Sequence, residues 1–276
     1  MRMSWRGGLA ALAAVATAAT MTITLDGAVS ARGYQAVPPP PAQPTRADQI
    51  QNIDQVKTAI KAYYGDTVTS DVDPYDGDGA AVILHTYAKD GAYAHETRGI
   101  ARRASERLTA FAENHHGKKA LIFDVDDTTL NTYNYEIYAN FVYNPTSNAA
   151  FVNAAVFPKV PGMPRLARRA ARHGYEIFFL TGRPEAQRAG TTTNLTDAGY
   201  ATPAADHLFL KDQTLPWLSS CTPTCTSAQY KALTRQHLTE DLGFRIVANF
   251  GDQPSDFTGG FFDRAVKMPN PMYYLP

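Results

Sequence analysis

The stretch ALIFDVDDTTL, residues 120–130, constrains the fold of this chain more than any other. Its apolar residues run directly into Asp124 and Asp126, and a short continuous apolar run predicts a strand buried on both faces. Side chains alternate along an extended chain, so the two aspartates point to the same side at the strand's carboxyl end. Ligands of open α/β sheets bind beyond the carboxyl ends of the strands. The stretch therefore predicts an acidic pocket at one edge of a sheet.

Two carboxylates this close together repel each other. They stay ionised only where a cation or an array of donors offsets the repulsion, which makes a hard metal such as Mg2+ the natural third party. An Asp-rich turn is equally typical of a solvated loop or of an N-cap for the next helix. Residues 124–128 alone therefore do not assign a site.

Four further strands are predicted at residues 175–180, 207–210, 244–250 and 265–268. Helical patterns separate them, including one at residues 162–173 that Gly174 ends. Strands that alternate with helices predict an α/β fold with a doubly wound parallel sheet. Polar residues follow these strands, so the pocket is expected where they meet.

Composition favours small-molecule chemistry. The 276 residues are 44% hydrophobic and 19% charged, which is typical of a globular protein with one main domain. Lys plus Arg and Asp plus Glu number 26 each, and the pI is near 7.1. No global charge favours nucleic acid or an anionic membrane as a partner.

The first residues are typical of an export signal. Arg2 and Arg6 precede an apolar run that ends near Val29-Ser30-Ala31, a small-residue cleavage site. We expect residues 1–31 to be removed and the protein to be secreted or extracytoplasmic, without a stable membrane anchor. The alternative is a retained anchor, which the many Thr and Ala residues disfavour. Residues 32–46 contain VPPPPAQP and predict an extended linker.

Residues 47–117 predict a helical extension before the sheet. One helical pattern begins near Thr45 or Asp48, and a second covers residues 80–114. The segment DVDPYDGDG between them, residues 71–79, lacks the Gly and Glu of a calcium loop and predicts a turn. His115 and His116 are expected to decorate a helix end rather than to bind metal.

The aromatic residues between 131 and 157 recur in an irregular helical rhythm. Such a stripe usually belongs to a core. Because it directly follows the Asp pair, it also fits a small helical cap at about residues 131–158, with a tyrosine contacting the substrate.

Cys221 and Cys225 fit a local disulfide in an exported protein, with a modest stabilisation because the closed loop is short. A zinc site would need two further ligands.

Taken together, the strand ends resemble the haloacid dehalogenase-like phosphohydrolases. The resemblance rests on DVDDT at 124–128, Thr181 at the end of the next strand, a downstream Lys, and GDxxxD at 251–256, and it covers residues 118–268. KVPGMPRLARRAARHGYEIFFLTGRPE, FRIVANFGDQPSDF and VKMPNPMYYLP are similar to the acid phosphatase group of secreted bacterial enzymes, class B or class C-like, and plant vegetative storage proteins.

The resemblance implies catalytic roles. Asp124 would attack phosphorus to give an aspartyl-phosphate, and Asp126 would protonate the leaving oxygen and then activate water. Thr181 would hydrogen-bond a phosphoryl oxygen, with Gly182 and Arg183 as further phosphate or substrate contacts. Asp127 is expected to point away from Asp126, so that its substitution is mild.

The resemblance also implies a Mg2+ site. Asp252 would bind the ion together with the carboxylate of Asp124 and the backbone carbonyl of Asp126, and Asp256 would support the ligands. A lysine would neutralise the phosphoryl charge. Lys231 is favoured because it opens a helix whose amides can join it, and Lys211 is retained as a pocket residue.

These features predict an exported, Mg2+-dependent acid phosphatase that acts on small phosphomonoesters. A phosphotransferase or nucleotidase would use the same chemistry, and a storage or binding protein would keep the fold without turnover. The intact Asp124 and Asp126 favour the enzyme. Oligomeric state and physiological substrate do not follow from the sequence.

Overall fold

The structure is a computed structural model that describes residues 44–72 and 81–275. The predicted signal peptide at 1–31, nearly all of the predicted linker at 32–46, and most of the predicted turn at 71–79 lie outside the described residues.

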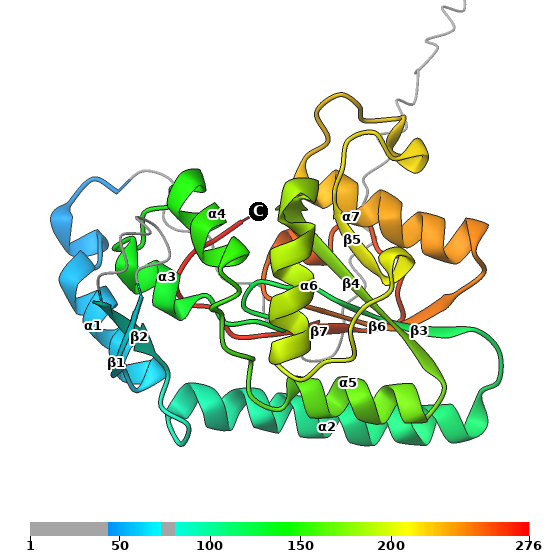
Figure 1. The fold of residues 1–276 in the computed structure, drawn as a ribbon, viewed down its shortest axis with the longest axis horizontal. Coiled ribbons are helices and arrows are strands. Elements are labelled where there is room, and N and C mark those ends of the chain that lie inside the picture. The colour runs from blue at the N-terminus through cyan, green and yellow to red at the C-terminus, as the bar shows by residue number, and fades with distance from the viewer. Residues whose placement is uncertain (1–43, 73–80, 276) are drawn as a thin grey trace, which may run out of the picture.

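A five-stranded parallel sheet forms the centre of the described chain, as predicted (Figure 1). The strand order is β5-β4-β3-β6-β7. The chain leaves β3 in one direction through β4 and β5, and then returns to the other side of β3 with β6 and β7. The winding direction therefore changes between β3 and β6, which is where ligands of such sheets bind. The strands are β3 (Lys119–Phe123), β4 (Tyr175–Pro184), β5 (Leu208–Lys211), β6 (Arg245–Gly251) and β7 (Ala265–Lys267).

Strand β4 is longer than the sequence indicated. It continues past Leu180 to Pro184, and its pairing with β5 shifts register between these two residues. Thr181, Gly182 and Arg183 therefore lie in an irregular final part of the strand rather than after it.

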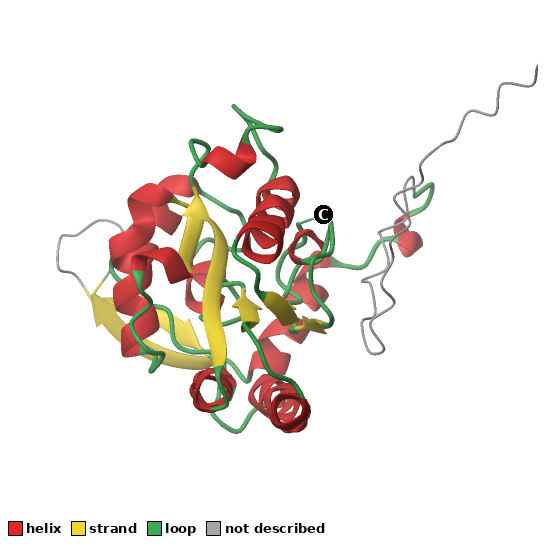
Figure 2. Cartoon of the chain, turned by 90° about the vertical axis from the view of Figure 1, so that its right-hand side faces the viewer, coloured by secondary structure: helices red, strands yellow, loops and turns green. Residues whose placement is uncertain are grey.

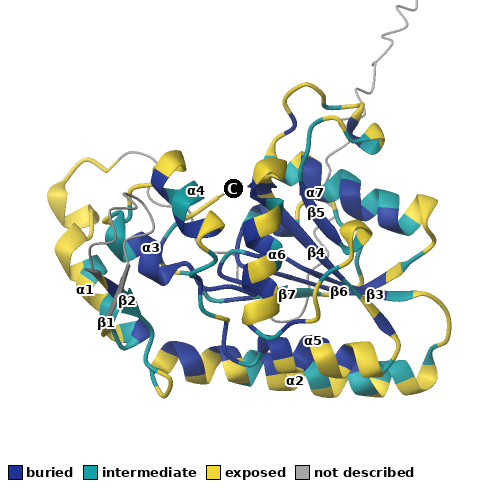
Figure 3. Cartoon of the chain, viewed as in Figure 1, coloured by how far each residue is buried: buried dark blue, intermediate teal, exposed yellow. Residues whose placement is uncertain are grey.

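Helices cover both faces of the sheet. Leu121 and Phe123 of β3 pack into one core, and their neighbours Ala120 and Ile122 pack into a second core on the opposite face. In Figure 2, two long helices are seen nearly end-on beneath the strands. Figure 3 shows the central strands as fully buried. The helices that follow β1 and β2 are α2 (Ala92–Asn114), α5 (Met163–Arg172), α6 (Arg188–Asp197) and α7 (Ser227–Gln236).

A small cap lies between β3 and α5. It contains α3 (Tyr133–Tyr138) and α4 (Pro145–Asn153), so the predicted helical segment is present. Tyr133, Tyr135 and Phe151 are completely buried, which makes most of the aromatic stripe part of a core. Tyr143 differs, because 68% of its surface is exposed.

The N-terminal extension is not purely helical, and this prediction was wrong in part. Residues 81–86 form β2 (Ala81–Thr86), which pairs antiparallel with β1 (Thr67–Val72). The sequence AVILHT of β2 holds three β-branched residues in six, a composition that favours a strand. The preceding helix α1 (Ile53–Tyr64) also starts later than predicted. It is capped by Asn52, whose side chain accepts from the amides of Asp54 and Gln55.

Tyrosine stacking binds the extension to the cap. The ring of Tyr64 stacks on that of Tyr133 at a centroid distance of 4.3 Å and lies 4.4 Å from that of Tyr93. The hydroxyl of Tyr133 donates to Asp66, which also pairs with His85 of β2. The extension therefore packs directly behind the first turn of the cap.

A groove of about 1100 Å³ lies between α1, α2 and the β6-β7 edge, with Ile60, Ile100 and Phe111 among its apolar lining. Lys267, Asn270 and the prolines beside Asn270 form one wall. In the described part of the chain, no helix is long and apolar enough to cross a membrane.

Candidate active site

The acidic residues predicted from the sequence meet at the carboxyl edge of β3 and β6. The amide of Asp124 donates to the carbonyl of Phe250 at 2.9 Å, which fixes the end of β3 against β6. Asp252 directly follows β6, and Asp256 ends the short turn Pro254–Asp256. Oxygen atoms of Asp124, Asp252 and Asp256 all lie within 4.8 Å of one another.

Lys231 lies buried between two of these carboxylates. Its Nζ is 2.5 Å from Oδ1 of Asp124 and 2.5 Å from Oδ1 of Asp256. Helix α7 delivers it and begins with a capping box between Thr226 and Gln229. Burial alone lowers the pKa of Lys231, but the carboxylates of Asp124 and Asp256 raise it above the ordinary value. Lys231 is therefore the local counter-charge of the acidic cluster.

The cluster fits a hard divalent cation. Burial raises the pKa of Asp124 well above its usual range, against the lowering effect of Lys231. Burial, with the charges of Asp256 and Asp127, raises the pKa of Asp252 to about 7. One lysine does not offset three buried carboxylates, and the oxygen-only donors are those that Mg2+ prefers. The residues present therefore fit the ion that the sequence predicted.

Asp256 supports the cluster from behind. Its Oδ2 accepts from the amide of Gln253 at 2.8 Å, so both of its oxygens already have donors. The buried Arg235 donates to the carbonyls of Asp256 and Gly260, each at 2.7 Å, and also to that of Thr258. Sequence reasoning missed Arg235. Its signal was the four-residue spacing from Lys231, which places both cations on one side of α7.

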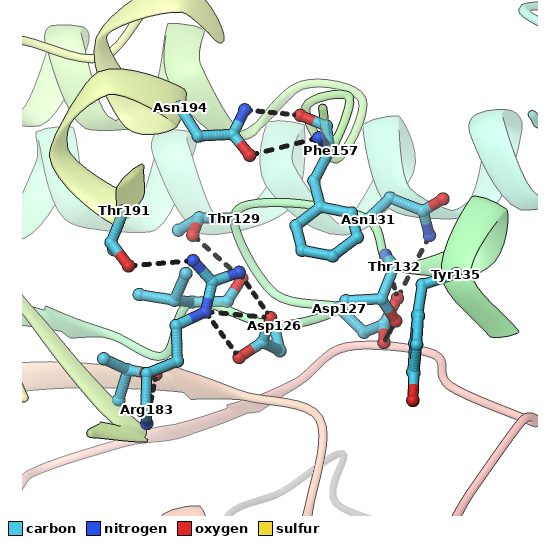
Figure 4. A network of polar contacts seen from close by, with 12 residues as sticks. Asp126, Asp127, Thr129, Asn131, Thr132, Tyr135, Phe157, Arg183, Thr191 and Asn194 are labelled. Atoms are coloured by element: carbon cyan, nitrogen blue, oxygen red, sulfur yellow. Dashed lines mark hydrogen bonds and ion pairs between the residues drawn. The ribbon is translucent and has the colours of Figure 1, made fainter. Parts of the chain in front are cut away.

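Asp126 is held by Arg183, not by the acidic cluster (Figure 4). Arg183 Nη2 lies 2.6 Å from Asp126 Oδ1, and its Nε lies 3.2 and 3.1 Å from the two carboxylate oxygens. Its Nη1 donates to Thr191 of α6, and its guanidinium lies over the ring of Phe157. Arg183 was predicted as a phosphate contact or a surface ion-pair partner. The structure instead shows a buried, bidentate partner of Asp126.

Asp127 points away from the pocket and organises the turn after it. Its φ of 53° lies in the left-handed region. The carboxylate accepts from Asn131 Nδ2, from Tyr273 OH, and from both the amide and the hydroxyl of Thr132. Burial raises its pKa to about 7, against the lowering effect of the Thr132 hydrogen bonds.

The other predicted pocket residues lie at the ends of β4 and β5. Thr181 is completely buried, and its Oγ1 accepts from the amide of Arg183 at 3.2 Å. A side chain at Gly182 would come within 3.7 Å of the Ser227 hydroxyl, so Gly182 faces the start of α7. Burial and the charge of Lys231 lower the pKa of Lys211. The acidic residues of the cluster contact Lys231, and no contact of Lys211 with them is found among the described residues.

Two cap residues that the sequence did not single out lie near Asp126. Glu136 of α3 is 7% exposed, and burial followed by the charge of Asp126 raises its pKa to about 7. Burial, Tyr135 and Asp126 together raise the pKa of the exposed Tyr143. The aromatic stripe drew attention to the cap but did not distinguish these two residues.

Cys221 and Cys225 form the predicted disulfide, with their Cα atoms 4.9 Å apart. It closes a loop between β5 and α7, and Cys225 packs in the core on that face of the sheet. The zinc alternative is therefore excluded for this state of the cysteines.

Comparisons with known proteins agree with this geometry. Acid phosphatase 1 of Solanum lycopersicum is 32% identical over 199 residues, which cover 71% of this chain and 74% of that protein. The stem 28 kDa glycoprotein of Glycine max is 34% identical over 165 residues, covering 58% of this chain and 61% of that protein. Vegetative storage protein 1 of Arabidopsis thaliana is 28% identical over 234 residues, covering 82% and 74%.

Among solved structures, a class C acid phosphatase from Bacillus anthracis with tungstate bound has a TM-score of 0.54 at 21% identity. The match covers 67% of this chain and 81% of that one, and it shows a shared fold. The family model described as HAD superfamily, subfamily IIIB (Acid phosphatase) matches residues 80–276. The chain therefore belongs to the acid phosphatases of subfamily IIIB of the HAD superfamily.

Proposed function

We propose that this chain is an exported, Mg2+-dependent phosphomonoesterase that works through a phosphate ester of Asp124. The observation that carries the proposal is the pair of 2.5 Å contacts from buried Lys231 to Asp124 and Asp256, beside Asp252. A nucleophilic carboxylate needs such a positive environment, because a phosphate monoester brings further negative charge into the pocket.

The first step is a displacement at phosphorus. A carboxylate oxygen of Asp124 forms a bond to phosphorus while the bond to the leaving oxygen breaks. The Thr181 hydroxyl, the backbone amide of Gly182 and the Lys231 ammonium bind the phosphoryl oxygens. When bound by Asp124 and Asp252, Mg2+ neutralises phosphoryl charge.

Asp126 moves the protons of both steps. It gives a proton to the leaving oxygen and then takes one from the water that attacks the aspartyl-phosphate, which releases inorganic phosphate and restores Asp124. The bidentate contact with Arg183 supports this role, because it fixes the direction of the carboxylate while 30% of the Asp126 side chain stays exposed toward the pocket.

The N-terminal residues support export, since Arg2 and Arg6 precede an apolar run and Val29-Ser30-Ala31. Similarity to vegetative storage proteins favours a second candidate, a storage protein with the same fold. The intact Asp124 and its contact with Lys231 favour turnover over storage alone. Transfer to an acceptor alcohol instead of water would need no further residue.

The test is hydrolysis of a panel of phosphomonoesters at acid and neutral pH, with Mg2+ or with excess EDTA. We expect activity that EDTA abolishes and Mg2+ restores, and loss of activity in Asp124→Asn. Full turnover in excess EDTA would refute the metal assignment. No turnover of any ester under any condition would favour the storage role.

A further inference from the structure

The chain ends in a segment that returns to the active site. Residues 268–275, MPNPMYYL, follow β7 and are called here the C-terminal strap. Met268 begins the strap, and its amide donates to the carbonyl of Gly251 at 2.7 Å, one residue before Asp252. Met268 and Met272 are buried. In the view of Figure 1, the strap leads from β7 to an end between the cap helix α4 and helix α6.

The strap holds the proposed metal ligand Asp252. Asn270 Nδ2 donates to Asp252 Oδ2 at 2.8 Å, and Gln253 Nε2 donates to the same oxygen at 2.6 Å. Gln253 is itself tied to the strap, since its Oε1 accepts from the amide of Leu275 at 2.7 Å. One carboxylate oxygen of Asp252 is thus fixed by two amides, which leaves Oδ1 to face the acidic cluster.

The strap also holds the turn that follows Asp126. The hydroxyl of Tyr273 donates to Asp127 Oδ2 at 2.9 Å. Asp127 is completely buried and has a left-handed backbone, so its position sets where the chain turns after Asp126. Asn270 and Tyr273 therefore reach the two acidic strand ends from one segment.

We propose that Asn270 and Tyr273 are positioning residues, and that the active site is complete only when the C-terminal strap is docked on Asp252 and Asp127. This inference rests on the proposed function, because it assumes that Asp252 binds Mg2+ and that Asp126 moves protons. The two residues act separately: Asn270 orients a metal ligand, and Tyr273 anchors the turn beside the proton donor.

The strap is built for a fixed conformation. Pro269 and Pro271 flank Asn270 and each restrict φ to one narrow range, which lowers the entropy lost when the segment docks. Partners that orient a metal-ligating carboxylate typically change metal affinity or activity by about 10- to 100-fold when removed. We therefore expect a large effect from single substitutions on the strap.

The experiment compares Asn270→Ala and Tyr273→Phe with the control Tyr274→Phe in the full-length protein. The control removes the same hydroxyl from the neighbouring tyrosine, which is 51% exposed. The readouts are the Mg2+ dissociation constant from calorimetry without substrate, the Mg2+ concentration for half-maximal hydrolysis, kcat at saturating Mg2+, and Tm in EDTA.

We expect Asn270→Ala to weaken Mg2+ binding by about 10- to 100-fold and excess Mg2+ to restore most of kcat. Tyr273→Phe should lower kcat by about tenfold while Mg2+ binding stays near that of the wild type. Tyr274→Phe should match the wild type in every readout. A merely structural strap would lower Tm and kcat in both variants with no rescue by Mg2+, and that result would overturn the inference.

Failure of this inference is distinguishable from failure of the proposed function. A Mg2+-dependent wild type whose Mg2+ affinity is unchanged in Asn270→Ala would overturn the strap's role alone. A wild type that neither binds nor needs Mg2+ would overturn both.

Discussion

Replacing Lys231 by Met tests how the acidic cluster is neutralised. Met keeps much of the volume of the lysine stem but removes the ammonium that contacts Asp124 and Asp256 at 2.5 Å. Loss of one donor that stabilises developing charge typically costs about 100- to 1000-fold in kcat. We expect a loss of this size in hydrolysis at saturating Mg2+. Lys211→Met is the matched control, because that lysine ends β5 and is only partly buried.

Stability should change with pH in the same variant. The side chains of Lys231 and Asp124 are each 8% exposed, so Lys231→Met leaves a buried carboxylate without its partner. Breaking a buried pair from one side costs about 3–5 kcal/mol. In EDTA at pH 8 we expect that loss of unfolding free energy. At pH 5 the loss should be smaller, because burial raises the pKa of Asp124 and the carboxyl can become neutral.

The assays are steady-state kinetics with Mg2+ and urea unfolding in EDTA at the two pH values. An active Lys231→Met protein beside an inactive Lys211→Met protein would refute the assignment of Lys231. Equal destabilisation of Lys231→Met at pH 5 and pH 8 would refute the electrostatic reasoning.

Three further predictions follow from the ion pairs and buried carboxyls. Arg183→Gln should lower kcat by about 10- to 100-fold at unchanged Mg2+ affinity, since it frees the carboxylate of Asp126, and kinetics with Mg2+ titration would check this. Asp127→Asn should lower unfolding free energy by about 1–3 kcal/mol in urea, because it turns an acceptor of four hydrogen bonds into a partial donor, and a mild effect would count against that network. Folding raises the pKa of Asp127, Asp252 and Glu136 to about 7, so the stability of metal-free protein is fully present below about pH 4 for these groups and is lost as the pH rises through about 7. A Tm in EDTA that rises between pH 5 and pH 8 would contradict it.

The sequence predicted the sheet because its strands are short apolar runs, and it predicted the acidic site because strand ends of a parallel sheet meet at one edge. It missed the hairpin at Thr67–Val72 and Ala81–Thr86, where the apolar run fits helix and strand alike. It also expected Asp127→Asn to be mild. The four hydrogen bonds of Asp127 come from residues as distant as Tyr273, and such partners follow from tertiary structure rather than from local spacing.

The central claim is that Asp124 carries the phosphoryl group. The most direct measurement is mass spectrometry of acid-quenched protein during turnover of a phosphomonoester with Mg2+, in the wild type and in Asp126→Asn. We predict a phosphate adduct on the peptide that contains Asp124, and more of it in Asp126→Asn with an aryl phosphate, because water activation is slowed. Retained turnover in Asp124→Asn, or an adduct on another residue, would contradict the account.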